Sequence, residues 1–285
     1  MKRPQLITIG TAIFLIAAIY IFGRTTPYKK NTVSSTEDHG HTHANEAGNL
    51  TDTILAMAKR QITPEQVMRI TTLENSISRG AVKQQQLMVY HQLAHFWGDT
   101  VGFFLPYAFY EAEGARLENS EKTLTFAARL FLDNLQSEEN MSFRKWEALQ
   151  AKDLFERSLT INPDNDSAKV GLGACYLFGG ISDAPMEGIG KIRQVVEKDS
   201  TNTYAHMMLA KGSILSGQYD KAITRLQTII RLKADDLEAI LMLADVYERK
   251  GDKASAIKWY QASLSMIKRK DVRTEIEKRI AELRK

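Results

Sequence analysis

The chain has 285 residues, of which 44% are hydrophobic, and it carries a formal net charge of +4. This length can bury one large hydrophobic core or two smaller ones. The excess positive charge lies within residues 268–285 and the rest of the chain is nearly balanced, which argues against a nucleic-acid-binding protein, because that class needs a broad basic face. The single cysteine, Cys175, excludes an intramolecular disulfide and a zinc site built from paired thiols, and we expect it to be a small buried apolar residue.

Residues 6–22 contain no charged side chain and follow Lys2 and Arg3 in a short tail of residues 1–5. A helix of this length spans about 26 Å, close to the thickness of a bilayer core. No cleavage site follows, so we predict an uncleaved transmembrane signal anchor, with a cleaved signal peptide as the alternative. Basic residues are almost equal in number on both sides, but the short tail favours a cytoplasmic amino terminus. We therefore expect a single-pass inner (cell) membrane protein whose carboxy-terminal domain is extracytoplasmic, in the periplasm where the cell has one.

Residues 23–50 contain almost no large aliphatic side chain, which predicts a flexible polar tether. Within the tether, Glu37 and Asp38 precede three alternating histidines, His39, His41 and His43. These side chains could hold Zn²⁺, Cu²⁺ or Ni²⁺ loosely. The alternative is a polar tether that is rich in histidine without any role in metal binding.

Residues 51–135 are predicted to be a divergent helical region with one or two hairpins. Thr63 to Gln66 form a capping-box pattern with proline at the first helical position, which predicts a helix from there to about Ser78. Residues 84–99 and 106–119 are expected to pair as one hairpin. His91 and His95 lie four residues apart there, with Asp99 on the same face; this spacing suits zinc ligands, or else the histidines line a packing seam. Residues 123–135 are predicted to pair with 151–161 across an enlarged turn at 136–150.

Two segments further on, Leu209–Ile230 and Leu243–Leu264, superpose with a shift of 34 residues. A third copy fits upstream with three extra residues in its turn, so that Gly188 takes the position of Ala256. Gly251 is expected to end one helix in a left-handed conformation and Asp252 to cap the next. A period of this length is typical of stacked helix-turn-helix units, in which no hairpin buries its apolar faces alone.

From Ala151 to Ser265 the sequence resembles the tetratricopeptide repeat family. The resemblance depends on the Leu-Ala, Tyr, Gly, Ala and Tyr positions of these copies and on Ala151, Phe155, Ser158 and Pro163. Departures are Ser200 and Ala234 where proline is usual, and Ser213 in place of an aromatic residue. The resemblance implies an all-α, tetratricopeptide-like α-solenoid behind the transmembrane helix, with repeats at 136–267. Residues 268–285 are expected to form a capping helix, since Val272, Ile276, Ile280 and Leu283 make a narrow apolar stripe.

In this family the first helix of each hairpin lines a concave groove that receives a peptide or a helix. Carried over by register, the resemblance implies the following partner-binding residues: Val170, Ala174, Phe178, Tyr204, Met207, Lys211, Leu241, Asp245 and Arg249. An apolar groove with a mixed-charge end suits a hydrophobic or helical segment of a protein partner. The alternative is that Val170, Met207 and Leu241 belong partly to the core.

The sequence contains no phosphate-binding loop, nucleophile elbow or HExxH motif, so we expect no enzyme activity and no cofactor. The expected function is that of a membrane-tethered scaffold for protein–protein interaction, with a partner in the same membrane. Anchored solenoids of this family serve processes such as envelope protein assembly. The alternative hypothesis is a metal-binding or metal-handling protein that uses the histidines of the tether.

Overall fold

The computed structural model of the chain describes residues 41–79, 82–181 and 185–285, and for residues 41–49, 78 and 79 it describes the backbone alone. The chain divides into two compact units, Met1–Asn45 and Glu46–Lys285. The repeats, the core and the candidate sites described below lie within the second unit. The predicted tail 1–5 and span 6–22 lie outside the described residues. Within the described ranges, no helix is both long enough and apolar enough to cross a bilayer.

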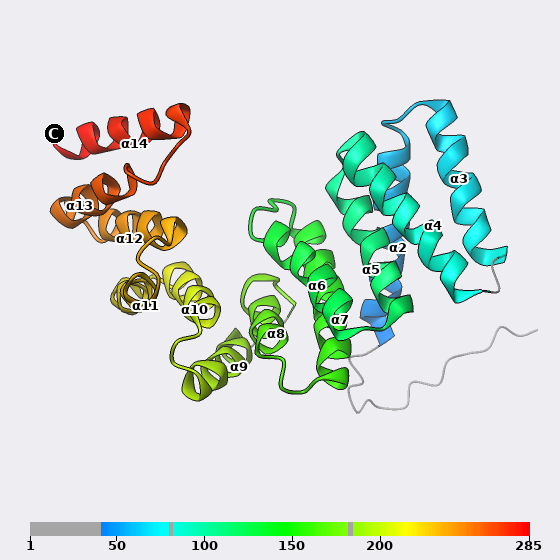
Figure 1. Cartoon of the computed structure of the whole chain (residues 1–285), viewed down its shortest axis with the longest axis horizontal. Helices are drawn as coiled ribbons and strands as arrows, with labels where there is room; N and C mark the ends of the chain where they lie inside the picture. Colours follow the sequence, from blue (N-terminus) through cyan, green and yellow to red (C-terminus); the bar gives the residue numbers. More distant parts are fainter. Residues whose placement is uncertain (1–40, 80–81, 182–184) are drawn as a thin grey trace, which may run out of the picture. The chain divides into compact units, whose positions relative to one another are not determined.

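The described residues form helices joined by short connections, without any strand among them (Figure 1). The helices that precede the repeats are α2 (His41–Lys59), α3 (Pro64–Arg79), α4 (Lys83–His95), the π-helix η1 (Phe96–Val101) and α5 (Phe104–Glu118). The predicted capping box is confirmed, because Gln66 N donates to Thr63 Oγ1 at 3.2 Å and Thr63 N donates to Gln66 Oε1 at 2.9 Å. The predicted pairing of residues 84–99 with 106–119 is also confirmed, as α4 packs on α5.

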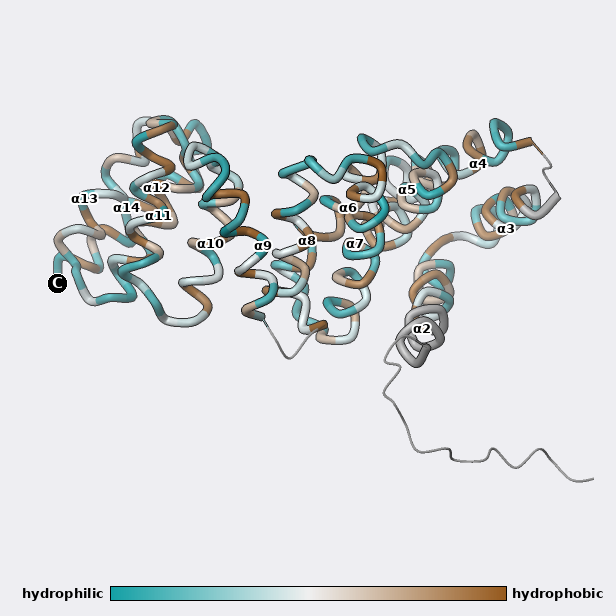
Figure 2. The backbone as a smooth tube through the Cα atoms, turned by 90° about the horizontal axis from the view of Figure 1, so that it is seen from below, coloured by the Kyte–Doolittle hydropathy of each residue, from teal (hydrophilic) through white to brown (hydrophobic). Residues whose placement is uncertain are grey.

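Four helix pairs follow one another along the chain, and each packs on the next. They are α6 (Glu121–Leu135) with α7 (Met141–Ile161), α8 (Asp166–Phe178) with α9 (Pro185–Lys198), α10 (Thr203–Leu215) with α11 (Tyr219–Leu232), and α12 (Leu237–Arg249) with α13 (Lys253–Ser263). The last helix, α14 (Lys270–Leu283), packs on α13. Hydrophobic and hydrophilic segments alternate along these helices (Figure 2), as expected where one side of each helix faces its neighbours. The chain is an all-α solenoid.

The repeat register follows from side chains at the helix ends. Asn165, Asn202 and Asp236 cap the first helices of successive hairpins, each accepting a hydrogen bond from the backbone N–H three residues later at 2.9–3.0 Å. The predicted cap of α13 is confirmed, since Asp252 Oδ1 accepts from Ser255 N at 3.0 Å. Gly251 adopts φ = 85°, the left-handed conformation expected at the end of α12.

Equivalent positions in the last two hairpins lie in like environments. Leu209 and Leu243 are both buried, and Ala222 and Ala256 are both fully buried. Ile276, Ile280 and Leu283 of the predicted capping stripe pack together against α12 and α13. The same pattern of small and large residues therefore supplies the contacts between helices in each repeat, as stacked repeats require.

In the hairpin of α8 and α9, two glycines face each other. A Cβ atom built on Gly173 would lie 2.6 Å from the carbonyl oxygen of Gly188, and a Cβ on Gly188 would meet the carbonyl oxygen of Gly173. Backbone therefore contacts backbone, and neither position accommodates a side chain. Cys175, on the same helix, is fully buried as predicted, and burial raises the pKa of its thiol.

The predicted enlarged turn at 136–150 is wrong, because α7 begins at Met141. Asn140 caps this helix by accepting hydrogen bonds from Ser142 N at 2.9 Å and Phe143 N at 3.2 Å. Trp146 and Ala148 are buried in the core, where the Trp146 ring packs edge-on against Phe131. The residues assigned to the turn thus carry an apolar face of their own.

The predicted boundary of the tether at residue 50 is also wrong, because the helix α2 already covers residues 41–50. Ile54, further along the same helix, is buried in the main core. Trp146 Nε1 donates to Thr51 Oγ1 at 2.9 Å, which joins α2 to α7. The helix therefore packs against the first repeat, a contact between segments far apart in the sequence.

Candidate functional site

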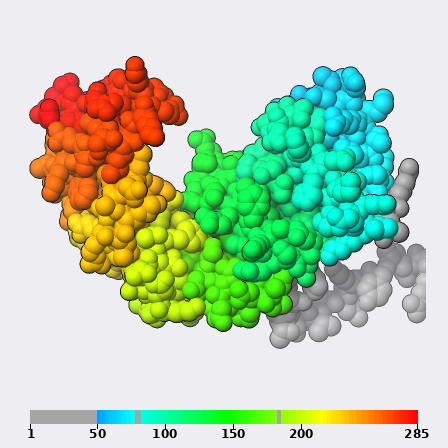
Figure 3. All heavy atoms as spheres, in the orientation of Figure 1, coloured from blue at the N-terminus to red at the C-terminus, as the bar shows by residue number. Residues whose placement is uncertain are grey.

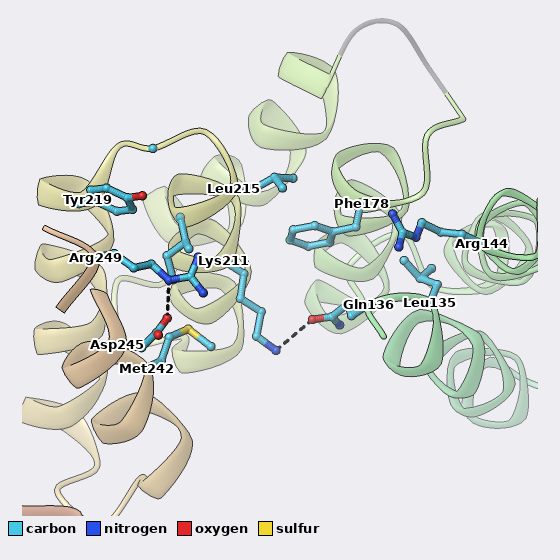
Figure 4. Close-up of a pocket in the computed structure, with 12 residues that line it drawn as sticks. Leu135, Gln136, Arg144, Phe178, Lys211, Leu215, Tyr219, Met242, Asp245 and Arg249 are labelled. Carbon is cyan, nitrogen blue, oxygen red and sulfur yellow. Dashed lines mark hydrogen bonds and ion pairs between the residues drawn. The ribbon is translucent and has the colours of Figure 1, made fainter. Parts of the chain in front are cut away.

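A pocket of about 700 Å³ opens among the repeats, between the end of α6 and the helices α8, α10 and α12. The surface is hollowed between the segments coloured green and yellow to orange in Figure 3. Figure 4 shows the pocket in detail. Its lining residues come from six helices and two connections: Leu135, Gln136, Arg144, Phe178, Lys211, Ile214, Leu215, Gly217, Tyr219, Met242, Asp245 and Arg249.

The apolar part of this pocket is formed at the ends of helices. Phe178 is the last residue of α8 and Leu215 the last residue of α10, and their side chains approach the gap from opposite sides (Figure 4). Leu215 is 69% exposed, which is unusual for a leucine, while Phe178 and Met242 are half-buried. Among the described residues, the pocket therefore presents apolar surface to solvent at the ends of these helices.

The rim is formed by paired charges. Arg249 Nε lies 2.8 Å from Asp245 Oδ2, and Lys211 Nζ lies 2.8 Å from Glu238 Oε1. Lys211 Nζ also donates to Gln136 Oε1 at 3.0 Å, so that its side chain crosses the gap between α10 and the end of α6 (Figure 4). These contacts place paired charges around the apolar floor.

Of the nine predicted groove residues, four line this pocket: Phe178, Lys211, Asp245 and Arg249. Leu241 lies apart from it, half-buried against α13 and α14. Val170 and Ala174 are fully buried and Met207 is 7% exposed, so these three belong to the core, as the alternative interpretation held. The role of the nine residues in binding a partner stays a prediction. Val170, Ala174 and Met207 have almost no solvent-exposed surface that a partner could contact.

The reason is that α6 covers this part of the inner face. The helix α6 packs on α8, and the guanidinium of its Arg129 lies 4.9 Å from the centre of the Tyr204 ring of α10. The Tyr204 hydroxyl is buried without a hydrogen-bond partner among the described residues, and burial raises its pKa. Burial also raises the pKa of Asp133 on α6, an effect that Arg129 and Lys211 oppose. The groove is therefore closed at Tyr204 and open at Leu215.

Leu215 could have been identified as a pocket residue from its position in the repeat. Leu215 lies 34 residues before Arg249, and it therefore occupies the same repeat position as Arg249. Met242 adjoins the predicted Leu241 on α12 and faces the pocket in its place. Gln136 and Arg144 could not be identified by repeat register. Both lie within residues 136–150, which were predicted to be an enlarged turn outside the repeated helices.

Of the predicted metal ligands, the structure describes the side chains of His91, His95 and their neighbour Asp99. His95 Nδ1 lies 3.1 Å from Asp99 Oδ2, but this pair is about 70% exposed, and His91 is exposed as well, so neither histidine lines a packing seam. His39 lies outside the described residues, and of His41 and His43 only the helical backbone is described. Among the side chains that the structure describes, no group of three His, Cys, Asp or Glu residues is arranged to hold a metal ion.

Comparisons with known proteins agree with this architecture. Residues 216–270 match the family model of the tetratricopeptide repeat. The fold is similar to that of TTC0263, a thermophilic TPR protein of Thermus thermophilus, with a TM-score of 0.51 and 15% identity, covering 71% of this chain and 98% of that one. MamA of Desulfovibrio magneticus RS-1 gives a TM-score of 0.43 and 19% identity, covering 63% of this chain and 94% of that one. No curated protein matches the sequence.

The matched residues contain α11, α12 and α13 and overlap both segments that are related by the 34-residue shift. The family-model match identifies tetratricopeptide repeat sequence at residues 216–270, and the solenoid fold of the described residues is similar to that of a tetratricopeptide repeat protein.

Proposed function

We propose that this protein is a scaffold that binds a hydrophobic or helical segment of a partner protein in the pocket around Leu215. The observation that supports the proposal is the exposed apolar surface of Leu215 and Phe178 inside a rim of paired charges. An apolar segment would remove this surface from water, and the rim would contact its polar flanks. No catalysis is part of the proposal.

We further propose that the scaffold is held at the inner membrane by residues 6–22, with the repeats outside the cytoplasm. The charge-free run in the sequence supports this part. Tethering would raise the effective concentration of a partner in the same membrane. A reporter fused after Lys285 tests the topology: periplasmic alkaline phosphatase should be active there, and an active cytoplasmic reporter would contradict it.

Replacing Leu215 by glutamate should strongly reduce capture of the partner without affecting the fold. The side chain is mostly exposed, so its loss costs little stability, whereas a charge in the apolar floor must be desolvated when the partner binds. We expect affinity purification of the full-length protein from its own membranes to recover about tenfold less partner.

The matched control is Leu232→Glu, at the last residue of α11. Leu232 is also an exposed leucine, at 42%, and it does not line the pocket. This variant should recover as much partner as the wild type. Equal loss in both variants, or no loss in either, would contradict binding at this pocket.

A further inference from the structure

A second cavity, of about 640 Å³, lies between α9 and α11 over α10. It shares no lining residue with the pocket around Leu215. Its apolar wall is formed by Leu177, Ile189 and Leu209, and three cations, Arg193, Lys221 and Arg225, surround this wall. None of the lining residues is a carboxylate. The cavity therefore combines apolar surface with positive charge that its own lining does not neutralise.

Arg225 is held in place by a buried histidine. Its Nη1 lies 3.3 Å from His206 Nδ1, and His206 Nε2 lies 2.9 Å from the carbonyl oxygen of Ser200. Because a guanidinium only donates, Nδ1 accepts and the Nε2–H donates to Ser200 O. His206 is 5% exposed, so this chain of hydrogen bonds is fixed by the core. The guanidinium thus has a defined position before any ligand arrives.

The charges in this cavity repel one another. Burial lowers the pKa of Arg225, and the like charge of Arg193 lowers it further. Among the described residues, the one carboxylate within 4 Å of the Arg193 guanidinium is that of Glu197, at 3.9 Å and largely exposed. Lys221 Nζ donates to the neutral Gln218. An anion between the two guanidinium groups would relieve this repulsion.

The hydroxyl groups in the cavity offer no donor for such an anion. Ser213 Oγ donates to Leu209 O at 2.8 Å, Thr224 Oγ1 to Asp220 O at 2.9 Å, and Thr228 Oγ1 to Thr224 O at 3.0 Å. The charged donors are those of the three cations, and the amide of Gln218, which donates to Ser216 Oγ at 2.9 Å, is the neutral one. Guanidinium groups match carboxylates with two parallel hydrogen bonds, and the adjoining apolar wall needs an aliphatic side chain as its partner.

We propose that this cavity binds an acidic segment of a partner protein, with Asp or Glu carboxylates on Arg193 and Arg225 and an aliphatic side chain on Leu177 and Ile189. The volume and the apolar wall exceed what a single small anion would use, which favours a peptide over a free ion. The site is distinct from the pocket around Leu215, so a partner can engage both or either one.

The test measures binding of short fluorescein-labelled peptides to the full-length protein by fluorescence anisotropy. One peptide carries paired glutamates beside a leucine, and its counterpart carries glutamines instead. The glutamate peptide should bind more tightly, and Arg193→Gln with Arg225→Gln should weaken it by roughly tenfold or more. Arg231→Gln removes the same charge from an exposed position on α11 outside the cavity and should leave binding unchanged.

Arg225→Gln removes the contact with His206, so Arg193→Gln alone is the second variant. The Arg193 side chain is 60% exposed, and its loss should weaken binding without changing the thermal melting curve. Equal affinity for the glutamate and glutamine peptides, equal loss in Arg231→Gln, or unchanged affinity of the double variant for the glutamate peptide would overturn the proposal. Binding of inorganic phosphate without the glutamate peptide would also overturn it.

Discussion

Replacing Gly188 by alanine should destabilise the protein, whereas the same replacement at Gly190, two residues further along α9, should stabilise it slightly. A methyl group on Gly188 meets the backbone carbonyl of Gly173, which cannot move as a side chain can, and it also lies 3.0 Å from Tyr176 Cβ. Overpacking of this kind costs about 1–3 kcal/mol. A methyl group on Gly190 meets nothing within 4 Å, and alanine in a helix is worth roughly 0.5–1 kcal/mol over glycine.

Urea denaturation followed by circular dichroism gives both free energies of unfolding. Each variant adds one methyl group to a glycine of α9. Helix propensity alone would therefore raise the free energy of unfolding of both variants. A Gly188→Ala protein as stable as Gly190→Ala would contradict the backbone contact between α8 and α9.

The second large effect concerns Glu147, a fully buried carboxyl group on α7. Its Oε1 accepts a hydrogen bond from Asn134 Nδ2 at 2.6 Å, while its Oε2 is buried without a partner among the described residues. Burial raises the pKa of Glu147 to about 8, which the bond from Asn134 and the charge of Arg144 only partly offset. In the unfolded chain the group titrates near 4.5.

Stability should therefore fall as the pH rises from about 4.5 to about 8, because the unfolded chain loses this proton first. Glu147→Gln keeps the shape of the group and the acceptor for Asn134 but has no proton to lose. Since each pH unit between two pKa values is worth about 1.4 kcal/mol, the variant should be more stable than the wild type by about 3 kcal/mol at pH 7. Near pH 4.5 the difference should almost vanish.

Urea denaturation at a series of pH values tests this expectation. Glu139→Gln, an exposed position just before α7, is the control and should follow the wild-type pH dependence. A Glu147→Gln protein that loses stability with rising pH as the wild type does would show that Glu147 does not titrate in this way.

Helices with strong local signals were predictable from the sequence. The capping box at Thr63 and the cap at Asp252 depend on residues close together in the chain, and the structure confirms both. The register of Leu209 with Leu243 depends on a repeated pattern in the sequence, and both residues are buried as that pattern predicts. The enlarged turn was wrong because residues 141–150 contact partners distant in sequence, such as Trp146 with Thr51. A pattern confined to neighbouring residues does not report such contacts.

The candidate pocket was predictable only in part. Repeat register placed Phe178, Lys211, Asp245 and Arg249 on the inner face, and these residues line the pocket. The repeat register does not show whether the first helix of one repeat covers the first helices of the repeats that follow. Near Tyr204, Arg129 of α6 covers part of α10. Met207 belongs to the core, while Leu215 lies exposed at the end of α10. Whether a repeat position is open depends on how closely α6, α8 and α10 approach one another.

Site-specific photocrosslinking tests most directly whether the pocket around Leu215 binds the partner. A photoreactive amino acid placed at Leu215, at Leu232 or at Met186 in the second cavity reports which surface the partner covers in intact membranes. We predict a crosslinked adduct from Leu215 and none from Leu232, whatever Met186 gives. An adduct from Leu232 with none from Leu215 would contradict the assignment of the pocket as the partner-binding site.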